Sequence, residues 1–587
     1  MFHPLPRGFH CWVAIAAVLI AVIATWPVAA HLSDHVVDGA RLVNPKNTND
    51  FWSGNIGADV LLTTWVVNWD LHALVTQPLH LFDANIFYPA PLPLARSEHL
   101  FGIALLALPG RLLGGPVVAH QSALLLCSVL NVWGTAYAVT RWTGSLGGGL
   151  VAGLLLAVSP FHQHNPAHIQ SVATGYLPLL LLALEGYVAT GAPRWAAAGA
   201  AGLLLQMLSG QYLAYYALVV WLVGGAVLVL VGRPAARPLP RLARDVGVLA
   251  AASTAATLMV VPFVIPYLRL GAEVPSNVER GLFFTSVLSL RSYLLTGSFP
   301  QTWLHVPQAT WALAVLGTVA LALGGRFERA RVVALVLVGL AGALLSLGPK
   351  PGSMGLYRLA VDIFPGFRTV REPDRASVLV FVALALLSGC GAAALLRRLP
   401  RLGPPLVLGL TALSFVSSWH GPTLVRPMAV GAELPGAYRF LARCGGGDPL
   451  LELPIYSAYE SWREAEREFY STYHWLPLLN GRSGYPPPLY LTTIKVAAQL
   501  PDAAALASLR ETTAVRWVLV HCDQAAGQPT RAVHLCSPEP PPGMSKPRVF
   551  GDTLLYDLGP ARDLPRPWPA RWPTPADCAL PEPTPGR

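Results

Sequence analysis

Apolar runs of about 20 residues recur along roughly the first 420 positions of the chain, separated by short polar segments. A run of that length, wound as an α-helix, can cross the hydrocarbon core of a bilayer. The first run, Cys11–Ala30, follows Arg7 and exceeds a usual signal-peptide core, so we expect an uncleaved anchor. Ten further spans are expected to centre near Val129, Leu154, Leu181, Leu203, Leu222, Thr257, Val315, Leu337, Leu384 and Leu410. The pattern predicts a mainly α-helical transmembrane bundle of about 11 spans.

Composition agrees with a membrane protein and excludes several other classes. Hydrophobic residues make up 53% of the 587 positions and charged residues 12%, whereas a soluble domain carries about 25% charged residues. The net charge of +10 does not indicate a nucleic-acid partner, because the arginines separate the apolar runs instead of forming one basic face. The lack of GxSxG, P-loop and GxGxxG patterns argues against hydrolases, ATPases and dehydrogenases.

The basic residues between the spans predict the orientation, because cytoplasmic loops carry an excess of Lys and Arg. One alternate set of loops holds Arg7, Arg141, Arg194, Arg233, Arg237, Arg241, Arg244, Arg326, Arg329, Arg331, Arg397, Arg398 and Arg401. The N-terminus is then cytoplasmic, and the first loop and the C-terminal region are extracytoplasmic. This alternation requires Phe101–Leu113, which contains Pro109, to lie at the interface or to re-enter instead of spanning.

The first outer loop, residues 31–100, is too long for a simple connector. Val60–Leu74 has apolar residues at helical spacing, with Trp65 and Trp69 among them. This spacing predicts an amphipathic helix at the interface, with its tryptophans at headgroup depth. The prolines of Pro78–Glu98 forbid a continuous helix and predict a folded loop. We group this loop with the membrane helices as one domain, residues 1–419.

The sequence pattern of residues 420–559 predicts an extracytoplasmic mixed α/β domain. Leu434–Arg443 reads as a helix, Leu450–Ile455 and Val515–His521 as buried strands, and Val549–Tyr556 as a hairpin turning at Gly551-Asp552. Residues 560–587 predict a proline-rich disordered tail.

Four cysteines, Cys444, Cys522, Cys536 and Cys578, lie in this C-terminal part of the chain. Outside the cytoplasm, Cys522 and Cys536 could close a disulfide loop, although the sequence does not fix the pairing.

Several motifs resemble those of a known superfamily. They are Gly57-Ala58-Asp59, Leu79–Pro89, Ser97-Glu98-His99, Ser159-Pro160 with His168, Pro365-Gly366-Phe367-Arg368, and Tyr470–Trp475. Together with the layout, they resemble the GT-C membrane glycosyltransferases, and more narrowly a bacterial membrane-protein group distantly related to them, up to about His521. The resemblance implies a polyprenyl-phosphate-linked sugar as donor, an acceptor that is a glycan, lipid or protein outside the cytoplasm, and a place in the bacterial inner membrane.

The resemblance also implies an acidic residue early in the first outer loop, best matched by Asp59. A carboxylate there would take the proton from the acceptor hydroxyl as it attacks the sugar. Ala58 and the polar insert Asn44–Asn55 depart from the common pattern, so Asp34 or Asp38 could hold the role instead. Alternatively, Asp59 caps the helix that follows it.

The last outer loop carries cations on the side of the membrane where the charge rule expects few. They are Lys350, Arg358, Arg368, Arg371 and Arg375, near Asp362, Glu372 and Asp374. The cations either pair with these acids or with lipid headgroups, or they bind the donor phosphate, which guanidinium groups suit. For the phosphate we select Arg368, Arg371, Arg375 and Lys350.

The remaining candidate substrate-binding residues are Glu98, His99, Asp83, His168, Tyr473 and His474. Glu98 and His99 could also hold a divalent metal with Asp59 or Asp83, or form a hydrogen-bond network at headgroup depth. His168 shares an outer turn with His162 and His164, where ordinary interfacial histidines are the alternative. Tyr473 and His474 belong to an aromatic run that would either stack on a sugar or pack at the domain seam.

Two classes of function therefore stand against each other. One is a glycosyltransferase, and the other is a non-catalytic protein, either a lipid-linked glycan transporter or a cell-envelope assembly factor. A transporter should place paired ionisable residues in the middle of its spans. The spans contain few such residues, and Glu185 lies near a helix end, so the pattern favours the transferase.

Overall fold

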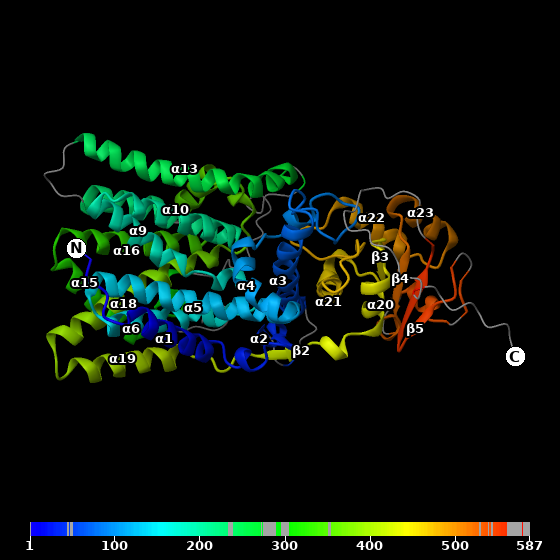
Figure 1. Cartoon of the computed structure of the whole chain (residues 1–587), viewed down its shortest axis with the longest axis horizontal. Helices are drawn as coiled ribbons and strands as arrows, with labels where there is room; N and C mark the ends of the chain where they lie inside the picture. Colours follow the sequence, from blue (N-terminus) through cyan, green and yellow to red (C-terminus); the bar gives the residue numbers. More distant parts are fainter. Residues whose placement is uncertain are drawn as a thin grey trace. The chain divides into compact units, whose positions relative to one another are not determined.

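A computed structural model describes residues 2–43, 46, 51–232, 239–271, 273, 289–294, 304–349, 354–526, 530–537, 539–541, 544–559 and 578. The chain divides into two compact units (Figure 1). Unit 1 comprises Met1–Ala30, Leu100–Ala107 and Gln121–Thr423, and unit 2 comprises His31–His99, Leu108–His120 and Leu424–Arg587.

Seven helical segments among the described residues are long and apolar enough to cross a membrane. They are Pro116–Thr143 (α5), Leu146–His164 (α6 and α7), Ile169–Thr190 (α8 and α9), Gln211–Gly232 (α11 to η4), Leu242–Leu270 (in α13, Leu239–Leu270), Arg326–Ser346 (α16) and Pro373–Arg398 (η8 and α18). Each contains one of the predicted span centres. The chain is therefore a multi-pass membrane protein, as the apolar runs predicted.

The other four predicted spans are shorter helices. They are α1 (Phe9–Ala24), α10 (Pro193–Leu208), α15 (Gln308–Ala322) and α19 (Gly403–Ser418). At 1.5 Å per residue, a helix of about 16 residues spans roughly 24 Å, less than the usual hydrocarbon thickness of about 30 Å. The predicted number of spans is therefore not confirmed. α4 (Phe101–Leu113) is shorter still and runs unbroken through Pro109.

The core of unit 1 is α18 (Val378–Arg398), which packs against α6 (Leu146–Ala157), α15 and α16. Glycine lets the backbones of α15 and α18 lie in direct contact. A Cβ on Gly317 of α15 would lie only 1.9 Å from the Leu387 carbonyl oxygen of α18, so a larger residue would not fit. On the same seam, a Cβ on Gly391 would lie 2.1 Å from the Leu313 carbonyl oxygen. Small residues let helix backbones approach in this way inside membranes, where van der Waals packing drives association.

Unit 2 is built around α3 (Phe51–Thr76), which packs against α2 (Gly39–Val43), η10 (Ala458–Glu464) and α21 (Ala465–Ser471). Its residues 60–70 are all buried, and the indole N–H of Trp65 donates to Asn85 Oδ1 at 3.0 Å. The prediction of an amphipathic interfacial helix was therefore wrong. Segments distant in sequence cover the face expected to meet water, and local periodicity carries no sign of them.

The C-terminal part of unit 2 contains a four-stranded sheet of order β3-β4-β6-β5. β3 (Leu450–Leu453) runs parallel to β4 (Trp517–His521), and β6 (Thr553–Asp557) runs antiparallel to β4 and to β5 (Arg548–Phe550). The predicted strands and the hairpin at Gly551-Asp552 are confirmed. Around the sheet the chain forms α20 (Gly436–Cys444), where a helix was predicted, and α22 (Pro488–Ala497), α23 (Ala503–Thr513) and α24 (Cys522–Ala526).

The first outer loop folds with the C-terminal region. β1 (His35–Val37) pairs antiparallel with β2 (Val425–Pro427). Further along, the Leu478 amide donates to the Asn85 carbonyl at 2.7 Å and the Phe87 amide to the Asn480 carbonyl at 3.0 Å. We predicted that this loop belongs to the same domain as the membrane helices, residues 1–419. In the structure, residues 31–99 belong to unit 2 instead. Pairing between segments almost 400 positions apart has no local sequence signature.

Two disulfides lie in unit 2, Cys444–Cys578 and the predicted Cys522–Cys536. Apart from Cys578, the tail predicted from residue 560 lies outside the described residues.

Candidate functional site

Asp59 lies on the third turn of α3 and forms an ion pair with Arg482. The Arg482 Nη2 lies 2.7 Å from Asp59 Oδ1, and it also donates to the Asn55 carbonyl at 3.1 Å and to Asn55 Oδ1 at 3.2 Å. Asn55 and Asp59 are four residues apart, so they share one face of the helix. The Asp59 side chain keeps 26% of its surface exposed, while that of Arg482 keeps only 8%. A buried cation thus fixes the position of a carboxylate that solvent can reach.

Glu468 of α21 holds the backbone at Arg482, because its carboxyl group accepts a hydrogen bond from the Arg482 amide. Glu468 is completely buried, and this burial raises the pKa of its carboxyl group well above the usual range. The hydrogen bond links α21 to the loop carrying Arg482, and the guanidinium of Arg482 links that loop to α3.

Unit 2 contains two more fully buried glutamates, Glu452 and Glu464. Glu464 bonds to Arg467 Nη1 at 2.5 Å and to Asn480 Nδ2 at 3.0 Å. Burial nevertheless raises the pKa of Glu464. Burial would also raise the pKa of Glu452, but the His521 imidazole at 2.7 Å and the Arg467 charge bring it below its usual value. Because these charged groups are buried and bonded to one another, they stabilise one arrangement of this part of unit 2.

Asp59 does not cap a helix. α3 begins at Phe51, which puts Asp59 well inside the helix, so the cap interpretation was wrong. Asp38, one of the alternative acids, does act as a cap, since its Oδ1 accepts from the Arg41 amide at 3.1 Å at the start of α2. The other alternative, Asp34, bonds to His35 Nδ1 at 2.8 Å. Of the three acids, Asp59 is the one whose partly exposed carboxylate is fixed by a buried arginine.

Tyr473 and His474 lie towards the opposite end of α3. Trp475 stacks on His72 of α3 with ring centroids 4.2 Å apart, and His72 is 13 residues beyond Asp59, or about 20 Å along the helix axis. Tyr473 is half-buried, and burial raises its pKa to about 12. His474 is buried, its Nδ1 accepts from the Leu476 amide at 3.0 Å, and burial lowers its pKa to about 4. The structure therefore does not bring this aromatic run to Asp59.

Other aromatic rings lie at the Asp59 end of α3. A Cβ on Gly54 would lie 2.7 Å from the ring of Trp462, so only glycine lets this tryptophan of η10 lie against the helix. The Arg463 guanidinium lies 4.5 Å from the centroid of the same ring. Trp52 and Tyr459 are exposed on α3 and η10. Rings that present a face to solvent suit contacts with sugars better than the enclosed run after Ser471.

The proposed metal ligands of the first loop are not gathered in one place. Asp83 bonds to His80 Nδ1 at 3.2 Å and accepts from the Leu92 amide at 3.2 Å, which holds the loop in shape. His99 is buried, and burial lowers its pKa to about 4. Among the described residues, three ligand atoms come together at His31, Asp34 and His35 and not at Glu98, His99, Asp59 and Asp83. Glu98, His99, Asp59 and Asp83 therefore do not form such a group among the described residues.

The arginines selected for the donor phosphate lie in unit 1. Arg368 and Arg371 are exposed, and Arg368 Nη2 donates to the Gly271 carbonyl at 3.3 Å. Arg375 is buried, forms an ion pair with Glu372, and its guanidinium lies 4.9 Å from the ring centroid of Tyr212. Pairing with a nearby acid, which was the alternative interpretation, thus holds for Arg375. Lys350 lies outside the described residues.

His168 also lies in unit 1, before α8 (Ile169–Val172), and is buried. His162 bonds to Ser159 Oγ at 2.8 Å and to Thr174 Oγ1 at 3.1 Å, and the ring of His164 meets that of His420 edge to face, with centroids 4.6 Å apart. No acid joins these described histidines in a metal-binding group. Their contacts match the interpretation as ordinary histidines of the turn.

Arg482 and Glu468, which lie on either side of the aromatic run Tyr470–Trp475, were not predicted from the sequence because nothing local marks their burial. For Arg482 the available signal was an isolated charge, because residues 475–481 and 483–494 carry none. Arg331 was also assigned to a cytoplasmic loop, whereas it lies inside α16, buried, with its Nε 3.0 Å from Glu185 Oε2 of α9 (Tyr176–Thr190). Its guanidinium lies 4.7 Å from the ring centroid of Trp142.

No protein-family model matches the chain, and a comparison with curated proteins found no match. The structure is similar to the oligosaccharyltransferase of Archaeoglobus fulgidus in its apo form, at 12% identity and a TM-score of 0.41, over 88% of this chain and 70% of that one. It is also similar to ArnT from Cupriavidus metallidurans in the apo state, at 14% identity and a TM-score of 0.35, over 94% and 98% of the two chains. Because the identities and TM-scores are low, no residue role passes from either structure to this chain.

Proposed function

We propose that the chain is an integral membrane glycosyltransferase that moves a sugar from a polyprenyl-phosphate donor to an acceptor outside the cytoplasm. The apolar helices supply a place in the bilayer, where a polyprenyl chain is soluble. The sequence motifs of the first loop supply the resemblance to GT-C enzymes. The observation that carries the proposal is the Asp59 carboxylate, which is partly exposed and held by the buried Arg482.

The transfer needs one base and one leaving group. The acceptor oxygen forms a bond to the anomeric carbon, and the bond from that carbon to the phosphate oxygen breaks. The acceptor proton passes to the Asp59 carboxylate, and the bonding electrons leave with the polyprenyl phosphate. In this proposal Arg482 is a positioning residue, because its ion pair fixes the direction of the Asp59 carboxylate.

The leaving phosphate gains negative charge, which a guanidinium stabilises. Arg368 and Arg371 keep exposed side chains and remain our proposed ligands for the donor phosphate. Arg375 is a weaker candidate, because Glu372 and Tyr212 already contact its guanidinium. Lys350 keeps its place in the proposal from the sequence alone.

Two observations support an extracytoplasmic position for unit 2. Its disulfides, Cys444–Cys578 and Cys522–Cys536, need an oxidising compartment to persist. The sequence prediction assigns the arginine-rich loops to the cytoplasmic face and the C-terminal region to the opposite face. The proposal therefore places the N-terminus in the cytoplasm of a bacterial cell and the chemistry at the outer surface of its inner membrane.

The test is product formation by the purified chain in proteoliposomes, supplied with a polyprenyl-phosphate sugar and candidate acceptors. We expect glycosylated acceptor and free polyprenyl phosphate in equal amounts, and we expect Asp59→Asn to abolish both. Asp502→Asn is the matched control, because Asp502 is also an acid of unit 2 but caps α23 through the Ala504 amide at 2.9 Å. An Asp59→Asn variant as active as Asp502→Asn would overturn the role of Asp59.

The phosphate ligands are tested by the same assay at varied donor concentration. Arg371→Met should raise the KM for the donor more than it lowers kcat, because Arg371 is proposed to bind donor phosphate in the ground state as well. Arg358→Met is the matched control, since Arg358 is an exposed arginine of the neighbouring α17 (Met354–Ile363). An unchanged donor KM in Arg371→Met would remove this residue from the phosphate site.

The alternative, a lipid-linked glycan transporter, finds some support in the buried ion pair of Glu185 and Arg331. The pair lies near the ends of its two helices and not in their middle, as Glu185 is five residues from the end of α9 and Arg331 five residues after the start of α16. Transport of an intact lipid-linked sugar across the proteoliposome membrane, without sugar transfer and unaffected by Asp59→Asn, would favour this alternative.

A further inference from the structure

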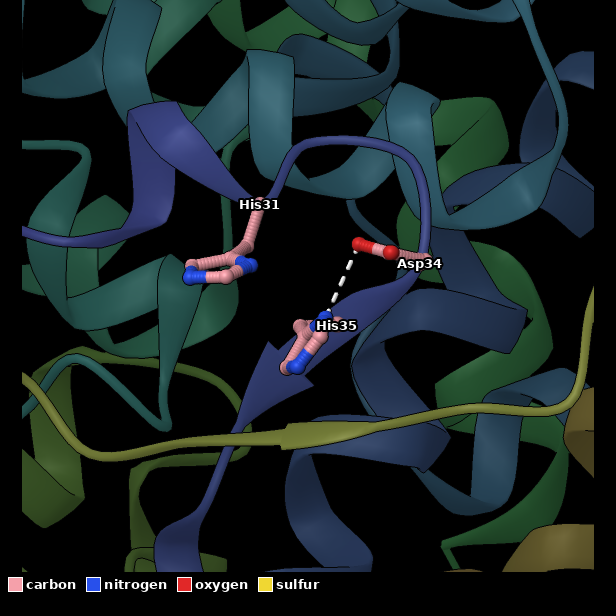
Figure 2. A group of neighbouring side chains, drawn as sticks. All are labelled: His31, Asp34 and His35. Atoms are coloured by element: carbon pink, nitrogen blue, oxygen red, sulfur yellow. Dashed lines mark hydrogen bonds and ion pairs between the residues drawn. The ribbon is translucent and has the colours of Figure 1, made fainter.

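The turn at the start of unit 2 brings three potential metal ligands together (Figure 2). One ligand atom each from His31, Asp34 and His35 lies within 4.8 Å of the others. Figure 2 shows the two imidazole rings and the carboxylate turned towards a common space beside the turn. The rings of His31 and His35 have centroids 4.3 Å apart, and Asp34 Oδ1 is 2.8 Å from His35 Nδ1.

The backbone holds this turn in place. His35 begins β1 and pairs with Pro427 of β2. The Asp34 carbonyl accepts a hydrogen bond from the Met428 amide at 2.7 Å. His31, Asp34 and His35 thus lie on a five-residue segment that the pairing of β1 with β2 holds in place. Binding an ion there requires little further ordering of the backbone.

The chemistry of the donor set selects the kind of ion. Two imidazole nitrogens and one carboxylate oxygen suit divalent transition metals, above all Zn²⁺. Mg²⁺ and Ca²⁺ prefer sites made wholly of oxygen ligands. Three protein ligands leave one position of a tetrahedral Zn²⁺ site for water.

We propose that His31, Asp34 and His35 form a binding site for Zn²⁺ or a related divalent transition metal, separate from Asp59 and Arg482. The bound ion would fix the turn before β1 and strengthen the pairing of β1 with β2. It would therefore join the start of the first outer loop more firmly to the segment that enters the C-terminal region.

The test is zinc binding by the metal-stripped full chain in detergent, measured by equilibrium dialysis with and without an excess of Ca²⁺ and Mg²⁺. We expect one bound zinc that an excess of Ca²⁺ and Mg²⁺ does not displace. The variants His31→Ala, Asp34→Asn and His35→Ala should each weaken zinc binding at least about tenfold, since even residues that only orient metal ligands are worth about 10- to 100-fold in affinity.

His80→Ala is the matched control, because His80 forms a similar pair with Asp83, at 3.2 Å, and the described residues form no three-ligand group there. Its zinc affinity should equal that of the wild type. Hydrogen exchange gives a second readout: zinc should slow exchange of the Met428 amide in the wild type and not in His31→Ala. No zinc bound by the wild type, or equal affinity in the wild type and the three site variants, would overturn the proposal.

Discussion

The ion pair of Asp59 and Arg482 predicts an unequal response to the loss of either partner. Arg482 is more deeply buried than Asp59, with 8% of its side chain exposed against 26%. Asp59→Ala leaves the buried cation of Arg482 without its carboxylate partner, which should lower the free energy of unfolding by about 3 kcal/mol. This value is the lower end of the range for broken buried ion pairs. We choose the lower end because Asn55 still accepts hydrogen bonds from Arg482. Arg482→Met leaves a carboxylate that water reaches, and methionine fills the volume of the alkyl chain.

We therefore expect Arg482→Met to cost about 2 kcal/mol, mainly through the donor lost to Asn55. Once Arg482 is gone, removing Asp59 costs little more, so the double variant should resemble Arg482→Met. The cycle then gives a coupling energy of about 3 kcal/mol. A surface pair would give less than about 1 kcal/mol and would lose it at high salt.

The assay is urea unfolding of the four purified proteins in the same detergent, followed by near-ultraviolet circular dichroism at low and high salt. Equal costs of the two single variants would refute the burial argument. Additivity within about 0.5 kcal/mol would refute the coupling itself.

Three further predictions concern other groups of unit 2. Burial raises the pKa of Glu468 in the folded chain, so the folded chain binds more protons than the unfolded chain. The free energy of unfolding should therefore fall as the pH rises above about 4.3, the pKa of a glutamate in the unfolded chain. Glu468→Gln should remove that loss, matching the wild type in urea unfolding at pH 4 and exceeding it at pH 8; parallel pH profiles would contradict this. Asn85→Ala should cost about 3 kcal/mol in the same assay, because Asn85 bonds to Trp65, Ser471 and Leu476, at about 1 kcal/mol each; a loss under about 1 kcal/mol would show that these bonds are not needed. Replacing Cys522 and Cys536 by serine opens a loop with a sequence separation of 14, which should cost about 3 kcal/mol, measured against the wild type with and without reductant.

Membrane helices were predictable because their signal is local. Each long apolar run carries its own hydropathy, and the run around Leu384 became α18, the core of unit 1. The strand pair β5–β6 was predictable for the same reason, because the dipeptide Gly551-Asp552 favours a tight turn between two strands. Short helices such as α10 and α15 show the limit: an apolar run fixes a helix but not its length.

Contacts between distant segments were not predictable. Trp65 looked like an interfacial anchor because nothing near it in sequence shows that Asn85 and α21 cover it. The candidate site shows the same division. Asp59 was found through its local motif, whereas Arg482 lies more than 400 positions away and its partner Glu468 is recognisable only through burial. The spacing of apolar residues shows which face of a helix or strand is apolar, but it does not show which other segment packs against that face.

The measurement that tests the central claim most directly is the turnover of a polyprenyl-phosphate sugar by the wild type and by Asp59→Asn, under conditions where both are folded by circular dichroism. Asparagine keeps an oxygen that can accept from Arg482 but cannot take the acceptor proton. A general base contributes about 10²- to 10⁴-fold to a rate, so the account predicts a fall in kcat of that size with little change in the donor KM. Equal kcat values in the two proteins would contradict it.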